Sequence, residues 1–159
     1  MRKQILGKDY PAEMSPGPGE LNIAAIATAL VSSDAAEYPI DNAFDTRRGP
    51  GGSRWIASEP GEQTLILAFD TPQTIRQISL EIEEQEVSRA QEIQLAVSQD
   101  GQTYRELLRQ EYNFSPPGTT FEREDWSVTA QDVTHLRLCI KPDKSGKPCR
   151  ATLTSLRLQ

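Results

Sequence analysis

Apolar residues recur at every second position in four segments of the chain. Such spacing places alternate side chains on one face of an extended strand, so each segment predicts a strand with one buried face. The four apolar sets are Leu65, Leu67 and Phe69; Ile78, Leu80 and Ile82; Ile93, Leu95 and Val97; and Leu136, Leu138 and Ile140. The pattern therefore predicts four strands together with their core-facing residues.

Turn signals and weaker patterns add further strands. The segment Ser98–Gln102 predicts a tight hairpin, because its Asp-Gly pair supplies the positive φ that such turns need. Weaker strands are expected at 119–121 and 126–128, and the last strand loses its alternation over 153–156, which indicates a bulge. Seven or eight short strands separated by turns favour an all-β sandwich.

The N-terminal part of the chain differs in composition from the rest. Residues 1–20 are rich in proline and glycine, which is typical of a leader or linker. One β-sandwich domain is therefore predicted over residues 21–159. The alanine-rich segment Ile23–Val31 fits a short helix and an irregular first strand equally well.

Neither a membrane span nor a secretory signal is expected. The longest apolar run, Ile23–Val31, is far shorter than the roughly 20 residues that a spanning helix requires. Polar residues follow the initial Met-Arg-Lys too closely to leave the apolar stretch of about 7–15 residues found in signal peptides. A cytoplasmic location is expected for the chain as written, with export by another route left open.

Composition and charge narrow the function classes. The chain has 159 residues, 25% of them charged, and a net charge of −6. This charge opposes attraction to nucleic acid and to anionic lipid, so neither partner is expected. Two cysteines cannot build a zinc site of cysteine pairs, and His135 is the only histidine available as a catalytic base.

The acidic run that begins at Glu81 could be compared with a pair of catalytic carboxylates. Alternation places Glu81 and Glu83 on the strand face opposite Leu80 and Ile82, so a solvated face is expected instead. No spacing in the chain marks two carboxylates held across a cleft, as glycoside hydrolysis requires. A binding module therefore fits better than an enzyme.

Several short motifs follow one another in an order that carries a family resemblance. They are Ala27-Thr28-Ala29, Ser32-Ser33, Tyr38-Pro39, Asn42-Ala43-Phe44-Asp45, Ser53-Arg54-Trp55, the segments 63–69 and 72–75, Ser98-Gln99-Asp100-Gly101 and Leu136–Ile140. This order, over residues 21–158, resembles the discoidin family, also called the coagulation factor V/VIII C-type domain. The resemblance implies a galactose-binding-like jelly-roll β-sandwich of about eight main antiparallel strands, and binding through loops at one end.

The resemblance also bounds the ligand. Members of the discoidin family bind glycans, phospholipid headgroups or proteins. The segments 34–37 and 46–52 match the loops that carry large apolar residues in the lipid-binding members, but they contain none here, so membrane insertion is not expected. Carbohydrate is the favoured ligand. The alternative is an intracellular protein-interaction or scaffold domain with the same fold.

A sugar site needs an aromatic ring for the C–H face of a pyranose and polar groups for its hydroxyls, and arginine adds a planar fork for an acidic group. The candidates on predicted loops are Tyr38, Arg47, Arg48, Arg54, Tyr112 and Asn113. Each also has an ordinary interpretation. Tyr38 fits a core aromatic, Tyr112 a cover for an open end of the sandwich, and the arginines solvated loop charges.

A structural calcium ion is implied for many bacterial sugar-binding members of the family. Asn42, Asp45 and Ser53 occupy the matching stretch, and they offer the oxygen ligands that calcium prefers. Arg47 and Arg48 also lie in this stretch, and two positive charges beside a dication are unfavourable. No cofactor is therefore expected to be required, and calcium remains an open alternative.

Overall fold

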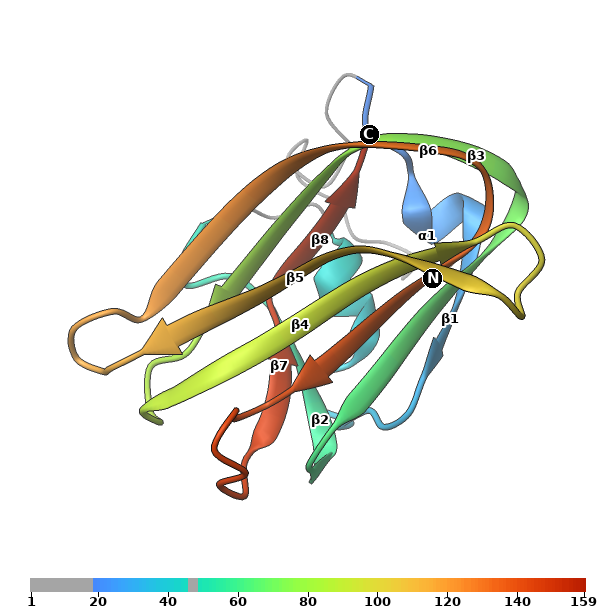
Figure 1. Cartoon of the computed structure of the whole chain (residues 1–159). Helices are drawn as coiled ribbons and strands as arrows, with labels where there is room; N and C mark the ends of the chain where they lie inside the picture. The colour runs from blue at the N-terminus through green and yellow to red at the C-terminus, as the bar shows by residue number, and fades with distance from the viewer. Residues whose placement is uncertain (1–18, 46–48) are drawn as a thin grey trace, which may run out of the picture.

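The protein is a β-sandwich of antiparallel strands (Figure 1). The computed structural model describes residues 19–45 and 49–159, so most of the predicted leader 1–20 lies outside the described residues. In chain order the described elements are α1 (Ile23–Ile26), β1 (Ala27–Val31), η2 (Ile40–Phe44), β2 (Trp55–Pro60), β3 (Gln63–Glu83), β4 (Arg89–Ser98), β5 (Tyr104–Phe114), β6 (Phe121–Lys141), β7 (Arg150–Leu153) and β8 (Ser155–Leu158). These eight strands agree with the predicted jelly roll.

Two long strands connect the layers of the sandwich. The first part of β3 and the last part of β6 lie in one layer, in the order β1-β3-β6-β4-β5. The second part of β3 pairs with the first part of β6 and with β8 in the other layer, beside the two-stranded sheet of β2 and β7. In Figure 1, β3 and β6 arch together across the top of the molecule.

The expectation of separate short strands is wrong for β3 and β6. β3 continues without a break from the apolar set at 65–69 to the one at 78–82, and its register with β6 shifts between Ala68 and Gln77. The shift lets both strands bend without ending, because irregular pairing increases the local twist of a ladder. β3 thus contains two of the four apolar sets, and β6 contains one set together with the weaker strand expected at 126–128.

The core lies between the two layers and contains all four predicted apolar sets. Leu67, Ile78, Leu80, Ile93, Leu95, Leu136 and Leu138 are fully buried, and the other members of the sets are at most 9% exposed. Trp55 from β2 is 1% exposed, as expected for a core tryptophan. The two-residue period of the sequence therefore determines which face of each strand is buried.

The structure resolves two segments near the ends of the domain for which the sequence pattern was irregular or ambiguous. The segment Ile23–Val31 contains both alternatives: one helical turn, Ile23–Ile26, followed directly by β1. The expected irregularity at 153–156 is a change of partner, because β7 pairs with β2 whereas β8 pairs with β3. Leu153 and Leu156 are consequently both buried although they are out of phase.

The predicted hairpin joins β4 to β5. Gly101 has φ +79°, and a Cβ atom at this position would lie 2.7 Å from Cε1 of His135. Only glycine tolerates both the conformation and the contact. Asp100 accepts hydrogen bonds from the backbone N–H groups of Gln102 and Thr103 at 2.8 and 2.9 Å, which closes the turn.

Two further observations concern the chain as a whole. In the part of the chain that the structure describes, the helices are too short to cross a bilayer. Cys139 and Cys149 are both free thiols.

We expect Leu67→Ala to lower the free energy of unfolding by about 2–5 kcal/mol, because it removes a buried side chain from the middle of β3 and leaves a cavity. Chemical denaturation measures the loss. The adjacent Ile66→Ala is the control, since Ile66 lies on the outer face of β3, where about 1 kcal/mol or less is expected. Equal losses would contradict the assigned faces.

Candidate functional site

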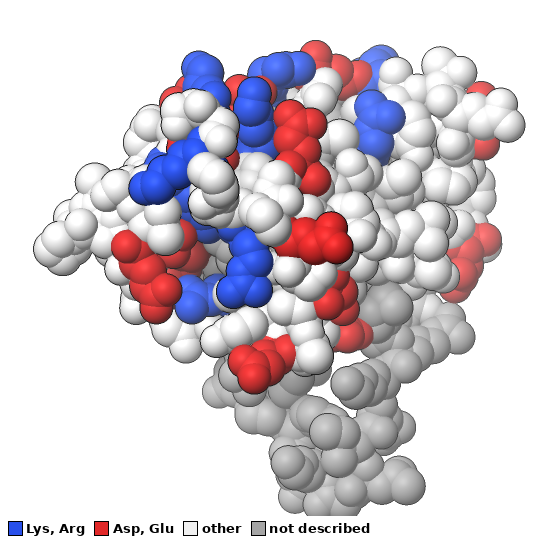
Figure 2. All heavy atoms as spheres, turned by 90° about the horizontal axis from the view of Figure 1, so that it is seen from below, with Lys and Arg blue, Asp and Glu red and all other residues white. Residues whose placement is uncertain are grey.

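Two hollows lie side by side at one end of the sandwich. The loops before β2, after β3 and before β7 form this end. Arg54 and Glu83 line both. The larger hollow has a volume of about 380 Å³, and its other lining residues are Glu37, Tyr38, Asn42, Gly51, Gly52, Ser53 and Gln85. The smaller cavity has a volume of about 130 Å³ and is also lined by Ile56, Glu84, Glu86, Val87, Arg89, Cys149, Arg150 and Thr152. Acidic and basic side chains are interspersed over the face seen from below in Figure 2.

Tyr38 is the aromatic residue of the larger hollow. Its backbone N–H donates to the Ala35 carbonyl at 2.9 Å, and its own carbonyl accepts from Ile56 N–H at 3.1 Å, so the loop is fastened to β2. The ring is half-buried, and the guanidinium carbon of Arg54 lies 5.9 Å from its centroid. At this distance the cation is attracted to the ring. The pair thus forms one wall of the larger hollow.

Two short hydrogen-bonded links hold the segment before β2 against η2. The Asn42 side-chain amide donates to the Arg54 carbonyl at 2.9 Å, and the Ser53 hydroxyl donates to the Asp45 carboxylate. Both links join groups that are close in sequence, across the turn that contains Gly49–Gly52. They fix the backbone from which the Arg54 side chain extends.

The expectation that Glu81 and Glu83 lie on a solvated face is wrong. They are 2% and 3% exposed because the loop with Gly49 and Gly51 covers the outer face of β3. Glu83 accepts from Gly51 N–H at 2.7 Å and from the Gln85 amide. Glu81 accepts from Arg157 of β8 at 3.2 Å and lies 3.8 Å from Arg123 of β6. Two buried carboxylates thus fasten the glycine loop to the sheet.

A third buried acid, Glu84, pairs with Arg89 at the start of β4. The two charged groups lie 2.9 Å apart, with side chains 11% and 4% exposed. The Arg89 guanidinium also donates to the Arg150 carbonyl at 2.6 Å. Its Nε is buried and has no partner. Arg89 therefore connects β3, β4 and β7 around the smaller cavity.

The structure brings together only some of the predicted ligand residues. Tyr38 and Arg54 meet in the larger hollow, whereas Arg47 and Arg48 lie outside the described residues. Tyr112 and Asn113 belong to β5, so their assignment to a loop is wrong. Tyr112 is 2% exposed and lies in the core, where burial and the nearby charge of Glu124 raise the pKa of its phenol. Its side chain is not available at the surface.

Other residues of the larger hollow were not predicted as ligand contacts. Glu83 and Gln85 enter it from the end of β3, and Asn42 and Ser53, expected as metal ligands, line it instead. No local pattern distinguishes Glu83 or Gln85 from solvated polar residues. Their role depends on the contact with the glycine loop, which is more than thirty residues away in sequence.

A third hollow, of about 490 Å³, lies at the β4–β5 hairpin. Its polar groups already bond to one another: Gln99 donates to the Gln131 carbonyl at 3.0 Å, and Arg105 donates to the Thr129 carbonyl at 3.4 Å. The ring of Tyr104 has the Arg137 guanidinium 4.2 Å from its centroid. A guanidinium therefore lies closer to the aromatic ring of this hollow than to the Tyr38 ring, where the distance is 5.9 Å.

The sequence was compared with families of known domains. The F5/8 type C domain matches residues 27–148, from the start of β1 to the loop before β7. The chain belongs to the F5/8 type C domain family. None of the curated proteins compared with this F5/8 type C domain matches it.

Solved structures share the fold of this F5/8 type C domain. CpGH89CBM32-5 from Clostridium perfringens, in complex with GalNAc-β-1,3-galactose, is 18% identical with a TM-score of 0.60, over 88% of this chain and 99% of that one. CBM32-3 from a Clostridium perfringens family 31 glycoside hydrolase is 14% identical with a TM-score of 0.62, over 87% and 93%. CBM32 of AlyQ, in complex with 4,5-unsaturated mannuronic acid, is 18% identical with a TM-score of 0.57, over 84% and 95%. At these identities the likeness establishes the fold.

The three predicted calcium ligands bond to other groups of the protein in this structure. Calcium takes six to eight oxygen ligands, commonly from several carboxylates. Across residues 19–45 and 49–159, no three His, Cys, Asp or Glu side chains are grouped to hold a metal. Of the three predicted ligands, Asp45 and Ser53 bond to each other and Asn42 bonds to the Arg54 carbonyl. These side chains fasten the loop in the structure, and calcium binding at this stretch stays a prediction.

We expect calcium to leave the melting temperature within about 1 °C of its value in chelator. At about 5 mM calcium, a site with a Kd of about 10 µM would stabilise the fold by about 3.7 kcal/mol, which is a shift of several degrees. Thermal unfolding in calcium chloride and in EDTA, with magnesium chloride as the control salt, measures the difference. A calcium-specific rise would show that Asn42, Asp45 and Ser53 do bind the ion.

We expect Glu84→Gln to lower the free energy of unfolding by about 1.5–3 kcal/mol, because Arg89 would keep its charge but lose its buried carboxylate. Denaturant titration measures the loss. The matched control is Glu86→Gln, two residues along, whose side chain is exposed and has no ion pair among the residues described. A similar loss in both variants would contradict the importance of the pair with Arg89.

Proposed function

We propose that this F5/8 type C domain is a non-catalytic carbohydrate-binding module whose sugar site is the larger hollow. One observation carries the proposal. Tyr38 presents an aromatic ring in a hollow of about 380 Å³ whose remaining wall is polar. That volume lies within the range of roughly 300–1,000 Å³ typical of small-molecule sites.

The groups of the larger hollow suit a pyranose. The Tyr38 ring offers an apolar surface to the C–H groups of a sugar. The donor groups of Asn42, Ser53 and Gln85 already bond to the protein, so these side chains offer their amide and hydroxyl oxygens as acceptors for its hydroxyls. Hydrogen bonds to the backbone or to β3 hold each of these segments, so little ordering is required when the ligand binds.

The hydrogen bonds of Glu83 support binding without hydrolysis. A retaining or inverting glycosidase uses two carboxyl groups that face each other across the scissile bond. Glu83, the buried carboxylate of the larger hollow, accepts from the Gly51 amide and from Gln85. We assign it the structural role of fixing the glycine loop.

Related modules support the ligand class. CpGH89CBM32-5 is in complex with GalNAc-β-1,3-galactose, and CBM32 of AlyQ with 4,5-unsaturated mannuronic acid. We extend carbohydrate binding from these modules to this chain. Because one of the two ligands is neutral and the other acidic, the relatives leave the charge of the sugar undecided.

A glycan array followed by calorimetry tests the proposal. We expect binding of at least one saccharide, and we expect Tyr38→Ala to weaken it about tenfold because the ring face is lost. The matched control is Tyr104→Ala, since Tyr104 is also half-buried but lies at the opposite hairpin with its ring covered by Arg137.

Two results would contradict the proposal. One is a folded sample that binds no saccharide at millimolar concentration; capture of a stoichiometric protein partner by that sample would favour the scaffold alternative. The other is a saccharide whose affinity falls with Tyr104→Ala and not with Tyr38→Ala, which would place the site at the β4–β5 hairpin.

A further inference from the structure

Three arginines from separate parts of the chain line the smaller cavity. Arg54 precedes β2, Arg89 begins β4 and Arg150 begins β7. The volume of about 130 Å³ is well below the roughly 300 Å³ at which sites for whole ligands begin. The smaller cavity is therefore the size of a subsite for one functional group.

The acids of the smaller cavity are largely engaged. Glu84 pairs with Arg89 at 2.9 Å. Glu83 accepts from Gly51 N–H at 2.7 Å and from Gln85. Glu86 is exposed at the rim. The buried carboxylates of this cavity thus already have hydrogen-bond donors from the protein.

The basic groups are less fully engaged. Among the described residues, neither Arg54 nor Arg150 has a carboxylate partner, and the Arg54 guanidinium lies 5.9 Å from the centroid of the Tyr38 ring. Arg89 is buried with its Nε unpaired. A buried N–H without an acceptor costs free energy, and an incoming acceptor would recover it. The unmet requirement of this cavity is therefore for a hydrogen-bond acceptor, and a negatively charged one.

We propose that the smaller cavity binds the carboxylate of an acidic sugar, so that the ligand of this module is a uronic-acid glycan. The inference rests on the proposed sugar site, because Arg54 lines both hollows and connects a sugar stacked on Tyr38 to the carboxylate subsite. The planar fork of arginine matches the two oxygens of a carboxylate. A dianionic phosphate fits less well, since Glu83 and Glu86 would repel its second charge.

Calorimetry with paired ligands tests the inference. The probes are galacturonate, glucuronate and mannuronate trisaccharides, each as the free acid and as its methyl ester, which removes the charge and adds one methyl group. We expect at least one acid to bind about tenfold more tightly than its ester. Arg150→Gln, which lies outside the larger hollow, should remove most of that preference while leaving the affinity for the ester nearly unchanged. Arg54→Gln should also remove the preference, and it should weaken binding of the ester as well, because Arg54 lines the sugar site.

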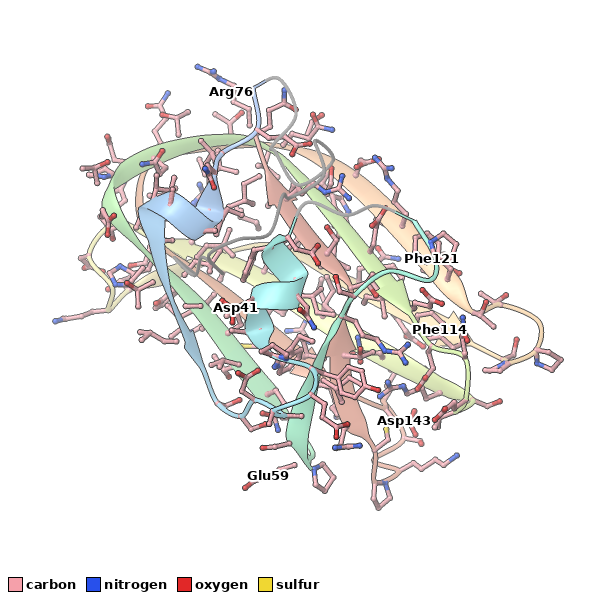
Figure 3. All side chains as sticks on the ribbon, turned by 180° about the vertical axis from the view of Figure 1, so that it is seen from behind. Asp41, Glu59, Arg76, Phe114, Phe121 and Asp143 are labelled. Atoms are coloured by element: carbon pink, nitrogen blue, oxygen red, sulfur yellow. The ribbon has the colours of Figure 1, made fainter. Side chains whose placement is uncertain are left out.

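The matched control is Arg76→Gln. Arg76 is an exposed arginine on β3, at the opposite end of the sandwich from Glu59 and Asp143 (Figure 3), and its substitution should change neither affinity. Arg150 is exposed, so its variant keeps the test valid if Arg54→Gln fails to fold.

The outcomes separate this inference from the proposed function. Equal affinity for acid and ester, binding of neutral sugars alone, or a stronger preference for a sulfated trisaccharide would each overturn the carboxylate subsite and leave the sugar site standing. An acid preference that survives both arginine substitutions would also overturn it. Failure of every saccharide to bind would overturn the proposed function, and the inference with it.

Discussion

The pairing of β3 with β6 is the constraint on which the rest of the structure depends. These two strands remain hydrogen-bonded to each other through both layers, from Gln63 with Ile140 to Glu83 with Phe121. Because they bend together, the apolar faces of both layers turn toward one interior. β1 and β8 pair with β3, and β4 pairs with β6, whereas β5 adds to β4 and β2 pairs with β7. The last residue of β3, Glu83, lines both hollows, so the pairing of β3 with β6 also helps to position the candidate site.

The buried charges at the end of β3 are costly, and each has a structural counterpart. Desolvation of a carboxylate is tolerated only with good hydrogen bonds or an opposite charge. Glu81 has Arg157, Glu83 has the Gly51 amide and Glu84 has Arg89. The three together fasten the glycine loop, β8 and β4 to the end of one strand. This region is therefore specified by polar contacts, whereas apolar packing specifies the middle of the sandwich.

The sequence predicts the features that depend on neighbouring residues and misses those that depend on distant segments. Alternation is a local property, so all four apolar sets and the hairpin at Asp100-Gly101 are confirmed. Whether the second face of a strand is also covered depends on distant segments, and for that reason the burial of Glu81 and Glu83 was missed. Tyr112 and Asn113 were predicted on a loop, although the two-residue spacing of Tyr112 and Phe114 fits the strand that the structure shows.

The candidate site depends on the same distinction. Tyr38 and Arg54 could be named from the sequence because aromatic and guanidinium groups on loops are candidate sugar contacts wherever they occur. Their neighbours could not, because Glu83 and Gln85 meet them only after β3 has crossed between the layers and the glycine loop has folded onto its end. The candidate site therefore has two parts. Tyr38 and Arg54 belong to short motifs that can be recognised in the sequence, whereas Glu83 and Gln85 reach the site only through the long-range pairing of β3 with β6. The second part places Arg54 on the lining of both hollows, which is the arrangement that the proposed carboxylate subsite requires.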